Sequence, residues 1–223
     1  MPRFEDCVQA FRNRASPAGC GGEGGQIAVA PCCSGLSSER MLHRREWVEI
    51  LLERLKQVRS GAILHFLGGP ADREYIESIM GELKIQAPWA NLDNHAGEMS
   101  LSQPVRLLGG MRELQCIDSG MLHFARLLGV KTVSYWGPTD PKTLMRPSLA
   151  GADTVSYYRL PCSPCVHLAS QAPCRGNNVC MRLAVSPARA ASLSSPAWLA
   201  IPVPLVASEG AAKIATPGGF PVA

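Results

Sequence analysis

The sequence predicts an α/β fold built on a doubly wound parallel sheet, and three observations support this. Short apolar segments alternate with longer ones whose apolar residues recur at helical spacing. Glycine, serine and aspartate gather where the apolar segments end. Residues 114–141 contain a complete unit of buried strand (114–117), helix and second strand (132–136). Such alternation is typical of a parallel sheet covered by helices.

The ordered part of the chain is predicted to begin with a strand at residues 26–30 and a helix at residues 44–58. Small polar residues, Ser34 among them, fill the loop between the two. Such a loop can present backbone and hydroxyl donors to a phosphate, and Arg40 is near enough to add positive charge. An ordinary loop with a serine helix cap explains the same residues, so this loop alone does not define a site.

The next strand and helix are predicted at residues 62–67 and 72–83. Between them, Gly68 and Gly69 would allow the backbone to approach a ligand closely. Asp72, just beyond, can accept hydrogen bonds from ribose hydroxyls. It can also cap the helix, and the two roles are compatible.

Residues 91–98 are expected to be a short connector, after which another helix begins at residues 99–101 and leads to the central unit. The predicted α/β domain therefore covers about residues 26–160. Right-handed crossover connections place the glycine and serine loops on one edge of its sheet.

Polar residues follow both strands of the central unit. Asp118, Ser119 and Gly120 lie where the first strand gives way to a helix, so that free backbone N–H groups and the positive end of the helix dipole form an anion site. Gly137 and Thr139 follow the second strand. Because ligands bind outside the carboxyl ends of parallel strands, both loops are expected to face one crevice.

The net charge, the short length of the apolar runs and the position of one glycine motif argue against several functions. The net charge is +4 with dispersed basic residues, so nothing indicates nucleic-acid binding. No apolar run approaches the roughly 20 residues that span a bilayer, and the first residues lack the order of a signal peptide. Gly19, Gly21 and Gly24 match G-x-G-x-x-G but precede the strand, so they do not form a dinucleotide loop.

Cysteine is abundant, with nine residues in all. Four of them follow the pattern C-x2-C-x8-C-x5-C, namely Cys162, Cys165, Cys174 and Cys180. As thiolates they could hold zinc tetrahedrally, although reduced thiols or a redox pair remain open. In a reducing compartment, reduced thiols or a bound metal are expected before disulfides.

The two ends of the chain differ from its middle. Residues 1–25 are rich in Gly, Arg and Ser and are expected to be a linker or a remnant. Residues 183–223 are dominated by Ala, Pro and Ser and are expected to be a disordered tail. The predicted domain is thus residues 26–182, including a cysteine-rich segment at 161–181.

Six ordered motifs resemble glycosyltransferase family 9, the ADP-heptose:lipopolysaccharide heptosyltransferases. The motifs are Ala-Pro-x-x-Ser-Gly, Leu-Gly-Gly-Pro-x-Asp, Ala-Gly-Glu-Met-Ser-Leu, Asp-Ser-Gly-Met-Leu-His-Phe-Ala-Arg-Leu-Leu-Gly, Trp-Gly-Pro-Thr-Asp-Pro and Pro-Cys-Ser-Pro-Cys. The resemblance covers residues 26–182 and implies a GT-B fold of two Rossmann-like domains. The part matched here resembles the C-terminal, donor-binding half.

The resemblance also implies roles for individual residues, with ADP-heptose as donor and no required cofactor. Arg40 falls where the family has a phosphate-binding lysine and would stabilise the departing ADP. The diphosphate would lie on Ser119, Gly120 and Met121. The full donor-binding set is Ser34, Arg40, Gly68, Gly69, Asp72, Met99, Asp118, Ser119, Gly120, Met121, His123, Gly137 and Thr139.

The chain departs from the family pattern in three places. Arg40 begins Arg-Met-Leu-His-Arg where the family has a Lys-x-Trp-Pro type sequence, the acceptor domain with its general base is absent, and the Ala/Pro tail replaces a closing helix. The leading interpretation is an inverting heptosyltransferase domain, incomplete without its acceptor domain, that acts on the lipopolysaccharide core in the cytoplasm or at the cytoplasmic face of the inner membrane. The alternatives are a non-catalytic nucleotide-sugar-binding module, an inactive fragment, and an interaction domain stabilised by metal at its cysteines.

Overall fold

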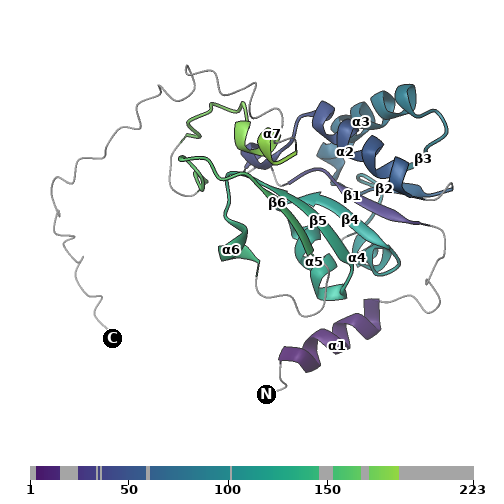
Figure 1. Ribbon diagram of the computed structural model, residues 1–223. Coiled ribbons are helices and arrows are strands. Elements are labelled where there is room, and N and C mark those ends of the chain that lie inside the picture. Colours follow the sequence, from purple (N-terminus) through teal and green to yellow (C-terminus); the bar gives the residue numbers. More distant parts are fainter. Residues whose placement is uncertain are drawn as a thin grey trace, which may run out of the picture.

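The structure is a computed structural model that describes residues 4–15, 25–33, 35, 37–58, 61–100, 102–145, 153–166 and 171–185. Its centre is a six-stranded sheet with the order β3-β2-β1-β4-β5-β6 (Figure 1). All five strand pairs are parallel. The strands are β1 (Ile27–Ala30), β2 (Ile63–Phe66), β3 (Asn91–Asn94), β4 (Glu113–Ile117), β5 (Lys131–Trp136) and β6 (Asp153–Tyr157).

The strand order reverses at the centre of the sheet. From β1 the chain moves outward through β2 to β3, and then returns to the other side of β1 to add β4, β5 and β6. The switch point therefore lies between β1 and β4, where ligands bind in open sheets of this kind. The predicted doubly wound α/β fold is confirmed.

Helices cover both faces of the sheet (Figure 1). Apolar residues of α2 (Arg44–Gln57), α3 (Arg73–Gln86) and α7 (Val179–Val185) pack against Ile27 and Val29 on one face. Those of α4 (Ser102–Gly109) and α5 (Gly120–Leu128) pack against Ala28 and Ala30 on the other. All four residues of β1 are buried, because a central strand with helices on both sides has no solvent face. A short helix, α6 (Pro141–Leu144), follows β5.

Helix α1 (Phe4–Ala15) occupies part of the segment where the sequence analysis expects only a linker. It packs on α5, with the Phe11 and Phe124 rings stacked at a centroid distance of 6.3 Å. Arg12 Nε also donates to the Leu127 carbonyl at 2.8 Å. Val8 is its one buried hydrophobic residue among those described, so the helical periodicity is too weak to read from sequence.

Two strands form where the sequence analysis names none. The expected connector at residues 91–98 contains β3, whose Asn-Leu-Asp-Asn sequence has low strand propensity but pairs along its length with β2. Strand β6 extends the sheet beyond β5 and pairs with it from Thr132 to Trp136. In β3, backbone pairing with a formed neighbour overrides weak local preference.

Helix α7 ends at Val185, whereas the predicted domain ends at residue 182. The remainder of the expected disordered tail, residues 186–223, lies outside the described residues. Among the helices of the described ranges, none is both long and apolar enough to cross a bilayer.

Candidate functional site

Arg40 and Asp118 join the loops that follow the two strands at the switch point. Arg40 ends the 3-10 turn Ser38–Arg40 after β1, and Asp118 directly follows β4. Arg40 Nη1 donates to the Asp118 carbonyl at 3.2 Å and to its Oδ2 at 3.3 Å. The two side chains are 20% and 5% exposed. The loops after β1 and β4 are therefore in direct contact at the switch point, while the predicted crevice between the loops after β4 and β5 stays a prediction.

Three predicted site residues carry buried polar atoms without a hydrogen-bond partner among the described residues. They are Arg40 Nε, Ser119 Oγ and Thr139 Oγ1. Leaving such groups unpaired in a protein interior is costly, so a native structure that keeps them calls for an explanation. Binding to the oxygen atoms of a ligand would satisfy the guanidinium donor and both hydroxyls.

The amino end of α5 lies at the same switch point. Ser119 is its N-cap residue in extended conformation, yet its side chain makes no capping hydrogen bond. Gly120 is exposed, so the first backbone N–H groups of the helix face an accessible surface. The helix dipole adds positive potential there, which favours an anion. Met121 and His123 follow on α5 and are both half-buried.

The loop from Gly68 to Asp72 has a structural explanation. Asp72 Oδ2 accepts a hydrogen bond from the Gly69 N–H at 2.8 Å and makes no side-chain cap to α3. A Cβ at Gly68 would lie 2.8 Å from Ile76 Cδ1, so glycine lets α3 pack closely here. Asp72 is the N-cap residue of α3 by position, and its carboxylate caps the preceding 3-10 turn (Pro70–Asp72) rather than the first N–H groups of α3. Its contact with ribose stays a prediction.

Met99 lies on a neighbouring segment. The Gly97 N–H donates to the Gly68 carbonyl at 3.1 Å, which holds the two segments together. Met99 itself is half-buried. Its predicted contact with a nucleobase stays a prediction. Ser34 lies outside the described residues.

Cys33 lines the loop after β1 as a neutral thiol. Burial raises the pKa of Cys33, and the positive charge of Arg40 offsets this only in part. Its Sγ donates to the Ser37 carbonyl at 3.0 Å. A protonated thiol beside Arg40 adds no negative charge that would repel a phosphate.

Gly137 is required by packing. A Cβ at this position would lie 2.6 Å from Cys180 Sγ and 3.0 Å from the Met181 backbone nitrogen. The end of β5 and α7 can therefore approach closely only because residue 137 has no side chain. The next residue, Pro138, accepts hydrogen bonds from the backbone N–H groups of Cys165 and Val166 at 3.0 and 3.2 Å.

The four clustered cysteines are free thiols. In the described part of the chain, no three of their sulfur atoms lie within 4.8 Å of one another. Burial, with the neighbouring sulfurs of Cys165 and Cys174 adding to it, raises the pKa of Cys180 to about 12. The predicted zinc at Cys162, Cys165, Cys174 and Cys180 stays a prediction.

A groove of about 400 Å³ lies elsewhere, at the amino ends of β4 and β5. It is lined by Arg54, Glu113 and Lys131, among others. Since ligands bind at the carboxyl ends of the strands, this groove is not part of the crevice.

Sequence reasoning missed three residues whose side chains meet: His65 on β2, Asp93 on β3 and His95 just after β3. The two histidines are 30 positions apart. No spacing motif connects them, and only the pairing of β2 with β3 brings them together.

The parallel sheet, its switch point and the helices on both faces define a Rossmann-like α/β domain of the kind found in GT-B glycosyltransferases. The model of glycosyltransferase family 9 (heptosyltransferase) matches residues 1–175. The chain belongs to this family, as the six motifs predict, and membership supports a glycosyltransferase function.

Similar proteins agree with this assignment. Lipopolysaccharide heptosyltransferase 1 of Pseudomonas aeruginosa is 35% identical over 83 residues, which are 34% of this chain and 22% of the relative. The structure of the ADP-heptose lipopolysaccharide heptosyltransferase II of E. coli is 23% identical, with a TM-score of 0.50 over 71% of this chain and 45% of that one.

The glycosyltransferase family 9 structure from Veillonella parvula is 18% identical, with a TM-score of 0.50 over 86% of this chain and 52% of that one. Both structures support the fold. The chain spans about half the length of the two structures, at 45% and 52%, and 22% of the curated relative.

Proposed function

We propose that this chain is the donor-binding domain of a heptosyltransferase that uses ADP-heptose. The observation that carries the proposal is the set of unpartnered buried donors, Arg40 Nε, Ser119 Oγ and Thr139 Oγ1, at the carboxyl ends of the strands. A diphosphate supplies the oxygen acceptors that these groups lack. Family membership makes a nucleotide sugar the natural source of that diphosphate.

The diphosphate lies at the amino end of α5, on the Ser119 hydroxyl and the backbone N–H groups of Gly120 and Met121. Asp118 orients the Arg40 guanidinium toward it through the ion pair. Met99 packs on the adenine, and the loop of Gly68, Gly69 and Asp72 meets the ribose. His123, Gly137 and Thr139 complete the site, together with Ser34 in the loop after β1.

The proposed reaction inverts the anomeric carbon. An acceptor hydroxyl of the lipopolysaccharide inner core attacks that carbon, its bond to the ADP oxygen breaks, and the oxygen takes the electron pair. Negative charge grows on the departing diphosphate, where Arg40 and the α5 N–H groups stabilise it. The general base that takes the hydroxyl proton comes from an acceptor-binding domain. The reaction takes place in the cytoplasm or at the cytoplasmic face of the inner membrane.

A binding module without activity of its own is the second candidate. The same buried donors support it, because they account for donor binding without any transfer step. Such a module would bind ADP-heptose and transfer nothing, whereas the enzyme requires the acceptor-binding half.

Calorimetric titration of the full chain tests donor binding. ADP-heptose and ADP should bind, while UDP and NAD serve as controls for the base and for a dinucleotide. If a well-folded sample binds none of them, the proposal fails for the isolated chain. Adding an acceptor-binding domain and a core oligosaccharide, and measuring ADP release, then separates the enzyme from the module.

A further inference from the structure

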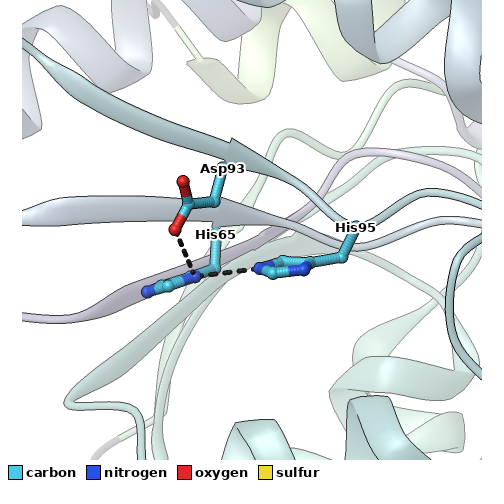
Figure 2. Close-up of side chains that lie close together, drawn as sticks. All are labelled: His65, Asp93 and His95. Atoms are coloured by element: carbon cyan, nitrogen blue, oxygen red, sulfur yellow. Dashed lines mark hydrogen bonds and ion pairs between the residues drawn. The ribbon is translucent and has the colours of Figure 1, made fainter.

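His65, Asp93 and His95 form a compact cluster on the side of the sheet away from α2 and α3. His65 and Asp93 are direct partners in the parallel pair of β2 and β3. His95 follows β3, and its backbone N–H donates to the Phe66 carbonyl at 2.9 Å. Leu64 and Phe66 pack into the core with α2 and α3, so the alternation of β2 turns His65 to the opposite face. Figure 2 shows the three side chains converging.

The distances within the cluster suit a metal ion. His65 Nδ1 lies 3.0 Å from His95 Nε2 and 3.5 Å from Asp93 Oδ2. All three ligand atoms lie within 4.8 Å of one another. Two ligand atoms that each lie about 2.0–2.1 Å from a tetrahedral zinc are separated from each other by roughly 3.3 Å. This separation falls between the 3.0 Å from His65 Nδ1 to His95 Nε2 and the 3.5 Å from His65 Nδ1 to Asp93 Oδ2. Small side-chain rotations would bring the three atoms into coordination.

Gln26 determines which nitrogen of His65 is available. His65 Nε2 lies 2.5 Å from Gln26 Oε1, an acceptor, so Nε2 carries the proton. The lone pair is then on Nδ1, which faces the Asp93 carboxylate. Nδ1 also lies beside His95 Nε2, so a cation placed there could accept an electron pair from each of the three side chains. A ligand histidine whose other nitrogen donates to an oxygen is the usual outer-shell arrangement of protein metal sites.

The cluster is open to solvent on one side. Asp93 is 51% exposed whereas His65 is 12% exposed, so an ion can enter from the Asp93 side.

We propose that His65, Asp93 and His95 bind a divalent transition-metal ion, with zinc as the best chemical match and water completing the coordination. Two imidazoles and one carboxylate suit zinc better than they suit magnesium or calcium, which take oxygen ligands. The site shares no side chain with the proposed donor site. Its ligands come from β2 and from β3 and its extension, so the bound ion holds this strand pair together.

Zinc titration of the full chain, purified without a histidine tag, tests the proposal. Because the four clustered cysteines can also bind zinc, the readout is the difference between variants. We expect His95→Ala and Asp93→Asn each to lose one bound zinc per chain relative to the wild type, or to bind it at least about tenfold more weakly. His43→Ala removes an exposed histidine outside the cluster and should change nothing.

Cobalt distinguishes the ligands independently, because thiolate ligands add sulfur-to-metal charge-transfer absorption and an all-nitrogen-and-oxygen site does not. The cluster should give cobalt ligand-field bands that His95→Ala removes while any thiolate absorption persists. Gln26→Leu leaves the ligands in place and should weaken binding roughly 10- to 100-fold. Circular dichroism without metal checks folding. Equal zinc stoichiometry and affinity in the wild type and the folded His95→Ala variant would overturn the proposal and leave a hydrogen-bonded histidine pair.

Discussion

Arg40 and Asp118 are 78 positions apart and meet with 3.3 Å between Nη1 and Oδ2. The pair spans the switch point of the sheet, since one residue follows β1 and the other follows β4. Arg40 Nε stays buried, with no hydrogen-bond partner among the residues that the structure describes. The guanidinium is thus held in place by one carboxylate while keeping a donor for a ligand.

Replacing Arg40 should weaken ADP binding. A charge-assisted hydrogen bond contributes about 1.5–3 kcal/mol, so Arg40→Ala should raise the Kd for ADP roughly 10- to 100-fold. Arg40→Lys keeps the positive charge but loses the planar guanidinium. Its Kd for ADP should therefore lie between those of the wild type and Arg40→Ala. Calorimetric titration measures both, and an unchanged Kd in Arg40→Ala would remove this residue from the site.

Ser119→Ala separates binding from stability. Among the described residues the buried Ser119 hydroxyl has no hydrogen-bond partner, and it does not cap α5, so its loss should leave the urea midpoint unchanged or raise it. ADP binding should weaken by about 0.5–1.5 kcal/mol, or a few-fold in Kd. Ser78→Ala is the matched control, because its hydroxyl bonds to the Tyr75 carbonyl on α3. Destabilisation of Ser119→Ala without a change in Kd would indicate a structural role.

Gly137→Ala should destabilise the fold. The added Cβ would lie 2.6 Å from Cys180 Sγ and 3.0 Å from the Met181 backbone nitrogen, which forces α7 away from β5. Overpacking of this kind costs about 1–3 kcal/mol. Urea unfolding measures the loss.

Gly81→Ala is the control for this substitution. It lies within α3, and a Cβ there meets no atom within 4 Å. Since glycine weakens a helix interior by roughly 0.5–1 kcal/mol relative to alanine, this variant should be more stable than the wild type. Equal effects at the two positions would refute the packing explanation.

Glu113 should make stability depend on pH in acid. Its side chain is fully buried, with Arg54 donating to both carboxylate oxygens at 2.8 Å and Lys131 Nζ 2.8 Å from Oε2. Burial alone raises the pKa of Glu113, but hydrogen bonds from Lys131 and Gln115 and the charge of Arg54 outweigh it, so the pKa is lowered from 4.5. The folded state therefore binds fewer protons than the unfolded state in acid.

The stability that Glu113 contributes is consequently complete above its unfolded pKa and is lost as the pH falls through its lower folded pKa. Glu113→Gln leaves Arg54 without its carboxylate and should cost about 3–5 kcal/mol at pH 7. Urea midpoints from pH 7 to pH 3 should fall less steeply in the variant than in the wild type. Parallel pH curves would show that this ion pair does not contribute to acid sensitivity.

Strong periodicity made most of the fold predictable from the sequence. Strands β1, β2, β4 and β5 are largely buried and apolar, and their boundaries were predicted within one or two residues. Strand β3 could not be recognised because Asn and Asp dominate it, and α1 because few of its residues are buried. Strand β3 and helix α1 are stabilised by contacts with elements that are distant in sequence, so the local sequence does not predict them.

The meeting of the loops after β1 and β4 was predictable, because parallel strands carry their following loops to one edge. The Arg40 and Asp118 contact agrees with that expectation. The sequence could not indicate that Gly68 and Gly137 are required by the packing of Ile76 and Cys180, since those partners come from other elements. Nor could it bring His65 to Asp93, because that contact depends on the register of β2 and β3.

The polar sequence of β3 also protects the sheet. A strand at the edge exposes unpaired backbone groups on which another chain could add, and long apolar edges promote aggregation. Strand β3 is four residues long, and it exposes Asn91 and Asp93. A strand of a second molecule could pair with only the four residues of β3, and it would lie next to the charged carboxylate of Asp93. The residues that make β3 hard to recognise therefore help to keep the protein from self-association through this edge.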